Sequence, residues 1–95
     1  MHRPAAFAAD TLVGSLCREI WDLRSRARQI QVALQRCQHP GLGQRLRQEL
    51  QNLASRRSEL QRLADQLGST QAQGPDHSVA VALLAELCRR PLRPG

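Results

Sequence analysis

The side chains of this sequence best suited to bind a ligand are arginines, because all 14 basic residues of the 95-residue chain are Arg. A guanidinium group binds carboxylate or phosphate through paired hydrogen bonds, which an ammonium group cannot do. Exclusive use of Arg is also what a GC-rich gene encodes. Four arginines are candidate contacts for an acidic protein surface or a nucleic-acid backbone. They are Arg24, Arg28, Arg56 and Arg57. The alternative is a solvated face of a charged helix.

Two neighbouring arginines have acidic residues at the right spacing for ion pairs within one helix. Asp22 precedes Arg26 by four residues, and Glu59 precedes Arg62 by three. Residues at these spacings are neighbours on a helix surface. Arg57 differs, because it falls within an apolar repeat. A single polar residue there fixes the register of two paired helices, with its charge reaching the edge, or it meets an acidic group of a partner.

No arrangement of residues in the sequence predicts catalysis or metal binding. The three cysteines are far apart and form no Cys-x-x-Cys pair. The histidines fall at predicted loops and chain ends, and Cys37 near His39 is a poor candidate for a nucleophile with a base because Cys37 lies within a predicted helix. We therefore expect no enzyme activity and no cofactor. The odd number of widely spaced cysteines predicts a reducing, intracellular compartment, either cytoplasmic or nuclear.

The overall composition is basic and poor in aromatic residues. The formal net charge is +6, and aromatic residues make up 2% of the chain. Single-stranded nucleic acids bind by stacking their bases on aromatic rings, so this class of partner is disfavoured. The longest apolar stretch, residues 79–84, is too short to span a bilayer, so we expect no membrane insertion.

Apolar residues at alternating steps of three and four predict a long amphipathic helix on each side of Pro40. The N-terminal repeat comprises Val13, Leu16, Ile20, Leu23, Ala27, Ile30, Leu34 and Cys37. The C-terminal repeat comprises Leu46, Leu50, Leu53, Arg57, Leu60, Ala64 and Leu67. When the chain folds back at Pro40, the two repeats match layer by layer, from Leu34 with Leu46 to Val13 with Leu67. The sequence therefore predicts an antiparallel two-helix coiled-coil hairpin.

Capping and helix-breaking residues divide the predicted all-α chain into five segments. Asp10 or Thr11 can cap the first helix, Pro40 with Gly41 stops it, and Gly68 fits the end of the second. The apolar positions after residue 76 recur at helical spacing and predict a short third C-terminal helix. The segments are a disordered N-terminal tail over 1–9, the hairpin over 10–67, a linker over 68–76, the short amphipathic helix over 77–90 and a basic tail over 91–95.

The expected stability of the hairpin alone is marginal, and this indicates a partner. Burial of each Leu or Ile contributes about 1.5–3 kcal/mol, whereas ordering each residue costs about 1–2 kcal/mol in backbone entropy. Apolar residues outside the repeat are candidates for partner binding. They are Leu12, Trp21, Val32, Leu63, Leu83, Leu84 and Leu87. The alternative is that the third helix covers one of these patches on its own hairpin.

Residues 60–67 match a short motif for binding of a helix to a groove. Leu60, Leu63, Ala64, Asp65 and Leu67 follow the required order of apolar, small and acidic residues. This segment resembles the core of the helix that pro-apoptotic proteins insert into the groove of survival proteins. The resemblance covers eight residues, and Arg56 stands where that family has an apolar anchor. The hairpin repeat also explains three of the matching residues.

The sequence as a whole predicts a non-enzymatic coiled-coil scaffold or adaptor subunit of a multi-subunit intracellular complex. Its partners would be other helical proteins or a second copy of the chain. The alternative function is a small Arg-rich nucleic-acid-binding module. The two differ in salt dependence, since phosphate contacts weaken steeply as salt rises.

Overall fold

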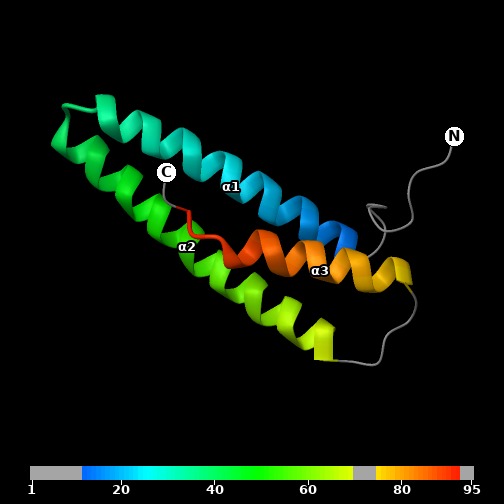
Figure 1. The fold of residues 1–95 in the computed structure, drawn as a ribbon. Helices are drawn as coiled ribbons and strands as arrows, with labels where there is room; N and C mark the ends of the chain where they lie inside the picture. The colour runs from blue at the N-terminus through cyan, green and yellow to red at the C-terminus, as the bar shows by residue number, and fades with distance from the viewer. Residues whose placement is uncertain (1–11, 70–74, 93–95) are drawn as a thin grey trace, which may run out of the picture.

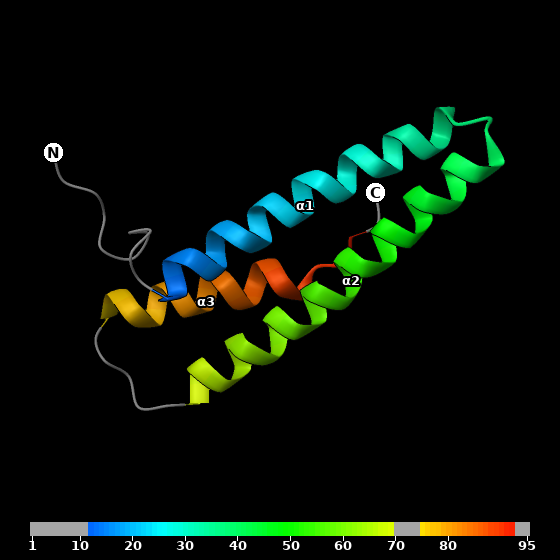
Figure 2. The same cartoon turned by 180° about the vertical axis from the view of Figure 1, so that it is seen from behind.

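The computed structural model describes residues 12–69 and 75–92, which form three helices. α1 spans Leu12–Arg36, α2 spans Pro40–Ser69 and α3 spans Pro75–Arg89. α1 and α2 run antiparallel as a hairpin, and α3 lies against both of them at the open end (Figure 1 and Figure 2). The predicted fold, a long helical hairpin with a short third helix, is confirmed. The predicted tail over 1–9, residues 70–74 of the predicted linker and residues 93–95 of the basic tail lie outside the described residues.

The turn between α1 and α2 is formed by residues 37–39, and His39 caps α2. The backbone N–H of Leu42 donates to His39 Nδ1 at 3.1 Å, and the N–H of Gly43 donates to the His39 carbonyl at 2.9 Å. The first bond satisfies an amide that the first turn of a helix leaves without a partner, and the second is the first backbone hydrogen bond of α2 itself. Pro40 therefore occupies the first helical position, which its fixed φ favours. As a result, α2 begins at Pro40 itself, which had been predicted only to stop the first helix.

The boundary between α2 and α3 also differs from the expected one. α2 continues through Gly68 to Ser69, whose hydroxyl donates to the Gln66 carbonyl at 2.9 Å. Gly68 faces α3, since a Cβ added there would lie 3.8 Å from Val81 Cγ1. α3 begins at Pro75, again with proline in the first helical position. Both ends of the predicted linker over 68–76 thus belong to helices.

The core follows the predicted apolar repeat most closely on α1. The buried residues of that repeat are Val13, Leu16, Ile20, Leu23, Ala27 and Ile30. On α2, Leu60 and Ala64 are buried, whereas Leu46 and Leu50 are half-buried. The better buried part lies at the open end, where α3 adds a third helix (Figure 1). The pairing of individual layers between the two repeats stays a prediction.

One edge of the hairpin carries two ion pairs between α1 and α2. Arg56 Nε lies 2.5 Å from Glu19 Oε2, and Arg26 Nε lies 2.7 Å from Glu49 Oε2. A step of seven residues forward on α1, from 19 to 26, matches seven back on α2, from 56 to 49, as antiparallel helices require. Hydrogen bonds from Arg56 hold the pKa of Glu19 below its usual value. These exposed pairs each contribute about 0–1 kcal/mol, so they orient the helices more than they stabilise them.

α3 packs across one face of the hairpin, against both α1 and α2, and runs in the same direction as α1. The Cys17 thiol donates to the Ala80 carbonyl at 3.8 Å, and Arg24 reaches the Leu87 carbonyl at 3.2 Å. Both contacts join residues 63 positions apart, so the two helices advance in the same direction. The buried residues of α3 are Ala80, Val81, Leu84 and Cys88, which complete one core with α1 and α2.

Candidate interaction surface

Arg24 of α1 binds the C-terminal end of α3 through three backbone carbonyls. Its Nη1 donates to the carbonyls of Leu87 at 3.2 Å and Arg90 at 2.7 Å, and its Nη2 donates to that of Pro91 at 3.1 Å. The last carbonyls of a helix have no partner within the helix and carry a partial negative charge, so a guanidinium group is a suitable cap. Burial, followed by the nearby charges of Arg90, Arg57 and Arg28, lowers the pKa of Arg24.

Two further side chains complete this cap. Arg57 Nη1 of α2 donates to the Cys88 carbonyl at 2.6 Å and to Gln61 Oε1 at 3.2 Å. Gln31 Nε2 of α1 donates to the Leu92 carbonyl. We call Arg24, Gln31 and Arg57 the carbonyl clamp. The clamp joins both helices of the hairpin to the end of α3, and it explains why the apolar repeat of α2 contains an arginine.

The structure corrects most of the anion-binding site predicted from the arginines. Arg24 and Arg57 belong to the carbonyl clamp. Arg56 pairs with Glu19 and also lies 2.8 Å from Glu59, which was expected to pair with Arg62. Within the described residues, Arg28 is the member of the predicted set that makes no hydrogen bond or ion pair.

We expect Arg24→Ala to lower the free energy of unfolding by about 1–2 kcal/mol, because three carbonyls of α3 lose a charged donor. Arg24→Lys should not restore it, since one ammonium group cannot reproduce the planar fork of donors. Urea unfolding followed by circular dichroism measures the change, and hydrogen exchange should rise in residues 87–92. Arg28→Ala is the matched control and should change stability by less than about 0.5 kcal/mol. Equal stability of Arg24→Ala and wild type would contradict the role of the clamp.

The three cysteines and His39 take part in packing and capping. Burial raises the pKa of the Cys88 thiol to about 11 and also raises the pKa of Cys17, so both remain protonated near neutral pH. The Cys37 thiol donates to the His39 carbonyl at 3.3 Å. His39 Nδ1 already accepts the Leu42 amide, so this nitrogen is not placed to take the thiol proton.

The most exposed apolar surface that joins two helices lies where α1 meets α3. Trp21 on α1 is 63% exposed, and Val79 and Leu83 on α3 are 60% and 36% exposed. Large side chains left in water at adjacent positions mark interaction sites more often than single scattered ones do. We call Trp21, Val79 and Leu83 the docking surface. Trp21 and Leu83 were predicted to bind a partner. Val79 was missed, although it lies one helical turn before Leu83.

The contacts between α1 and α3 place these residues side by side. Contact residues are 63 positions apart, so Trp21 lies level with Leu84, the neighbour of Leu83. Trp21 follows the contact residue Cys17 by one turn, and Leu83 follows the contact residue Ala80 by one turn. Both therefore project from the junction of the two helices, on its solvent side.

The remaining predicted partner-binding residues fall in three different environments. Leu84 is 0% exposed and lies in the core, which corrects its assignment, and Leu87 is half-buried beneath the docking surface. Leu12 and Leu63 are exposed, and the spacing of the ion pairs on their edge places them opposite each other at the open end. Val32 is exposed on α1, away from the docking surface.

The segment that resembles a groove-binding helix is turned inward. Leu60 and Ala64 are 0% and 1% exposed, so the two residues that would enter a partner's groove are in the core of this protein. Leu63 and Asp65 face solvent. Groove binding by this segment would therefore require the hairpin to open.

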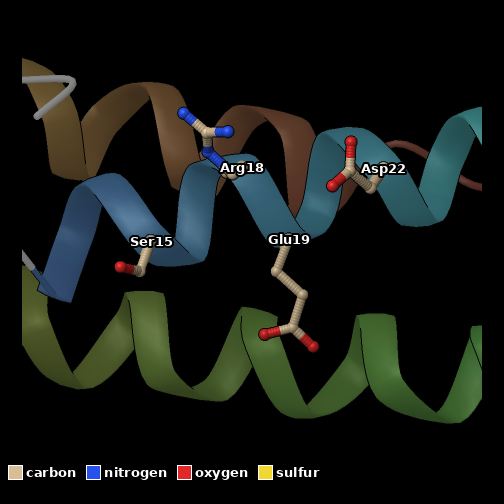
Figure 3. Close-up of a pocket in the computed structure, with 4 residues that line it drawn as sticks. All are labelled: Ser15, Arg18, Glu19 and Asp22. Carbon is tan, nitrogen blue, oxygen red and sulfur yellow. The ribbon is translucent and has the colours of Figure 1, made fainter. Parts of the chain in front are cut away.

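A shallow depression on α1 is lined by Ser15, Arg18, Glu19 and Asp22. Figure 3 shows the Glu19 side chain extending toward α2, where it pairs with Arg56, while Arg18 points to the opposite side of α1. The depression therefore contains an acidic group that is already neutralised.

The part of the chain that the structure describes contains no group of three His, Cys, Asp or Glu side chains arranged to hold a metal ion. Over the same residues, no helix has the length and the apolar character needed to cross a membrane. A scan against protein-family models finds no match, and comparisons with curated proteins and with solved structures find no significant similarity.

Proposed function

We propose that this protein is a helical scaffold or adaptor subunit that binds another helical protein through its docking surface. The observation that carries the proposal is the exposure of Trp21 and Leu83 on two different helices that the core holds in fixed relation. Interface energy is concentrated in a few large side chains, of which Trp is the most enriched. Its three free cysteines are compatible with assembly inside the cell.

The carbonyl clamp argues against nucleic-acid binding by the four arginines that were predicted to contact phosphate. A nucleic-acid module needs several cations free to contact phosphates. Arg24 and Arg57 instead bind carbonyls of α3, and Arg56 binds two carboxylates. Of the four arginines predicted to contact an anion, Arg28 is the one that forms no hydrogen bond or ion pair with the described residues.

Affinity capture from cell extract tests the proposal, with Trp21→Ala and Leu83→Ala compared with wild type. We expect both substitutions to reduce recovery of a specific partner about tenfold or more, because central aromatic and aliphatic anchors dominate interface energy. Leu42→Ala is the matched control, since Leu42 is an exposed apolar residue at the turn between α1 and α2. The recovered protein is then purified and mixed with wild type, and hydrogen exchange should slow in residues 17–24 and 79–87. Partners retained by both variants, or protection confined to other residues, would contradict the proposal.

A further inference from the structure

We infer that the docking surface binds an acidic amphipathic helix, whose apolar stripe covers Trp21 and Leu83 and whose carboxylates pair with Arg18 and Arg28. This inference rests on the proposed function and adds the chemistry of the partner. Val79 and Leu83 are four residues apart on α3, a spacing that matches the apolar stripe of another helix.

Arg18 and Arg28 place unpaired positive charge beside the docking surface. Arg18 precedes Trp21 by three residues, or one helical turn, and Arg28 follows Trp21 by seven residues, or two turns. Both therefore lie near the side of α1 that carries Trp21. Both are exposed, and neither makes a hydrogen bond or ion pair to any described residue. Of the carboxylates near Arg18, Glu19 points to the other side of α1 and is paired with Arg56 (Figure 3), whereas Asp22 follows Arg18 by four residues and makes no ion pair with any described residue.

The charged side chains of α3 near the docking surface differ from Arg18 and Arg28 in their ion pairing. On α3, Glu86 is bound by both Arg89 and Arg90, so among the side chains of α3 that the structure describes (residues 78–89) no carboxylate is free. Asp22 lines the same depression as Arg18 and offsets part of its charge, whereas Arg28 has no carboxylate within one helical turn of it on α1. The rim of the docking surface is therefore cationic, and a partner with carboxylates at its rim gains attraction and a faster encounter.

The same charges argue against a second copy of the chain as the occupant. Each copy has a formal net charge of +6, so two copies repel each other as they approach. Like charges at the rim of an interface disfavour association. A nucleic acid would pair with the arginines but would leave Trp21, Val79 and Leu83 in water. An acidic helix satisfies both the apolar and the cationic residues.

A designed peptide tests this inference on the full-length protein. The probe is a Trp-free peptide of about 20 residues, long enough to form a helix, with a Leu stripe flanked by Glu. Its matched control replaces each flanking Glu with Gln. Because the protein has one Trp, burial of Trp21 by the peptide should shift its fluorescence emission to shorter wavelength. Anisotropy of a labelled peptide gives the dissociation constant for variants that lack this Trp.

We expect the Glu peptide to bind several times more tightly than the Gln peptide and to weaken as salt is raised. Trp21→Ala should weaken it about tenfold or more, and Arg28→Ala or Arg18→Ala about two- to fivefold each, as for exposed ion pairs. Arg62→Ala, an exposed arginine on α2, is the control and should change nothing.

Three outcomes would overturn the inference. Equal binding of both peptides, with no loss in Arg28→Ala, would show a docking surface without selection for acidic partners. Absence of binding by either peptide would show that an isolated acidic helix is not the ligand. A wild-type dimer in sedimentation that Trp21→Ala converts to monomer would assign the surface to a second copy. None of these results alters the capture experiment. The proposed function is contradicted there if no partner depends on Trp21 and Leu83 for its recovery.

Discussion

Ile30→Asp should abolish most of the stability of the hairpin. Ile30 is 1% exposed and lies within the apolar repeat of α1. The substitution removes about 1.5–3 kcal/mol of apolar burial and leaves an unpaired buried carboxylate, which costs about 3–5 kcal/mol more. A domain of this size has about 5–15 kcal/mol in total. Circular dichroism during urea unfolding should show a lost or strongly shifted transition.

The pH dependence of Ile30→Asp identifies the buried carboxylate as the cause. An apolar site raises the pKa of the new Asp above its unfolded value of about 3.9. The destabilisation is therefore complete above the raised pKa and declines as the pH falls toward about 4. The stability difference from wild type should thus shrink on acidification, whereas Ile30→Asn should show no such change. Val32→Asp, at a position that is 44% exposed, is the control. A difference from wild type that stays constant with pH would place residue 30 in water.

Leu84→Ala should lower the free energy of unfolding by about 2–5 kcal/mol, as truncation of a fully buried leucine does. Leu84 is 0% exposed and belongs to the core shared by the three helices. Loss of its side chain leaves a cavity between α3 and the hairpin, so hydrogen exchange should rise across residues 79–89 before it rises in α1.

The neighbouring Leu83→Ala provides the comparison for Leu84→Ala. Leu83 is 36% exposed, so we expect it to cost less than about 1 kcal/mol. Urea unfolding measures both variants under the same conditions. Similar losses in the two variants would mean that α3 does not present Leu84 to the core and Leu83 to solvent.

The sequence predicted the hairpin well because its signal is periodic. Ile20 and Ile30 fall in one repeat on α1, and Leu60 falls in its counterpart on α2, so burial followed directly from spacing. The start of α2 was less certain, because Pro40 both ends one helix and favours the first turn of the next. His39 decides between these roles by capping the amides of α2.

The carbonyl clamp could not be predicted from the sequence. A guanidinium group bound to backbone oxygens leaves no complementary side chain in the pattern, so Arg24 looked unpaired. The ion pair between Glu19 and Arg56 was accessible in principle, since both residues precede a core position of their repeats by one. Leu84 was misassigned because an apolar face of a helix is equally suited to its own hairpin or to a partner.

Arg24, Gln31 and Arg57 hold the end of α3 through main-chain oxygens of residues 87–92. Such recognition is indifferent to which side chains those residues carry, so the exposed residues 89–91 are free to diverge during evolution while the segment stays attached, whereas Cys88 is also held by the core. The three donors have no such latitude. Orthologues of this protein should therefore keep Arg24 and Arg57, whereas the exposed residues whose main chain they bind should vary.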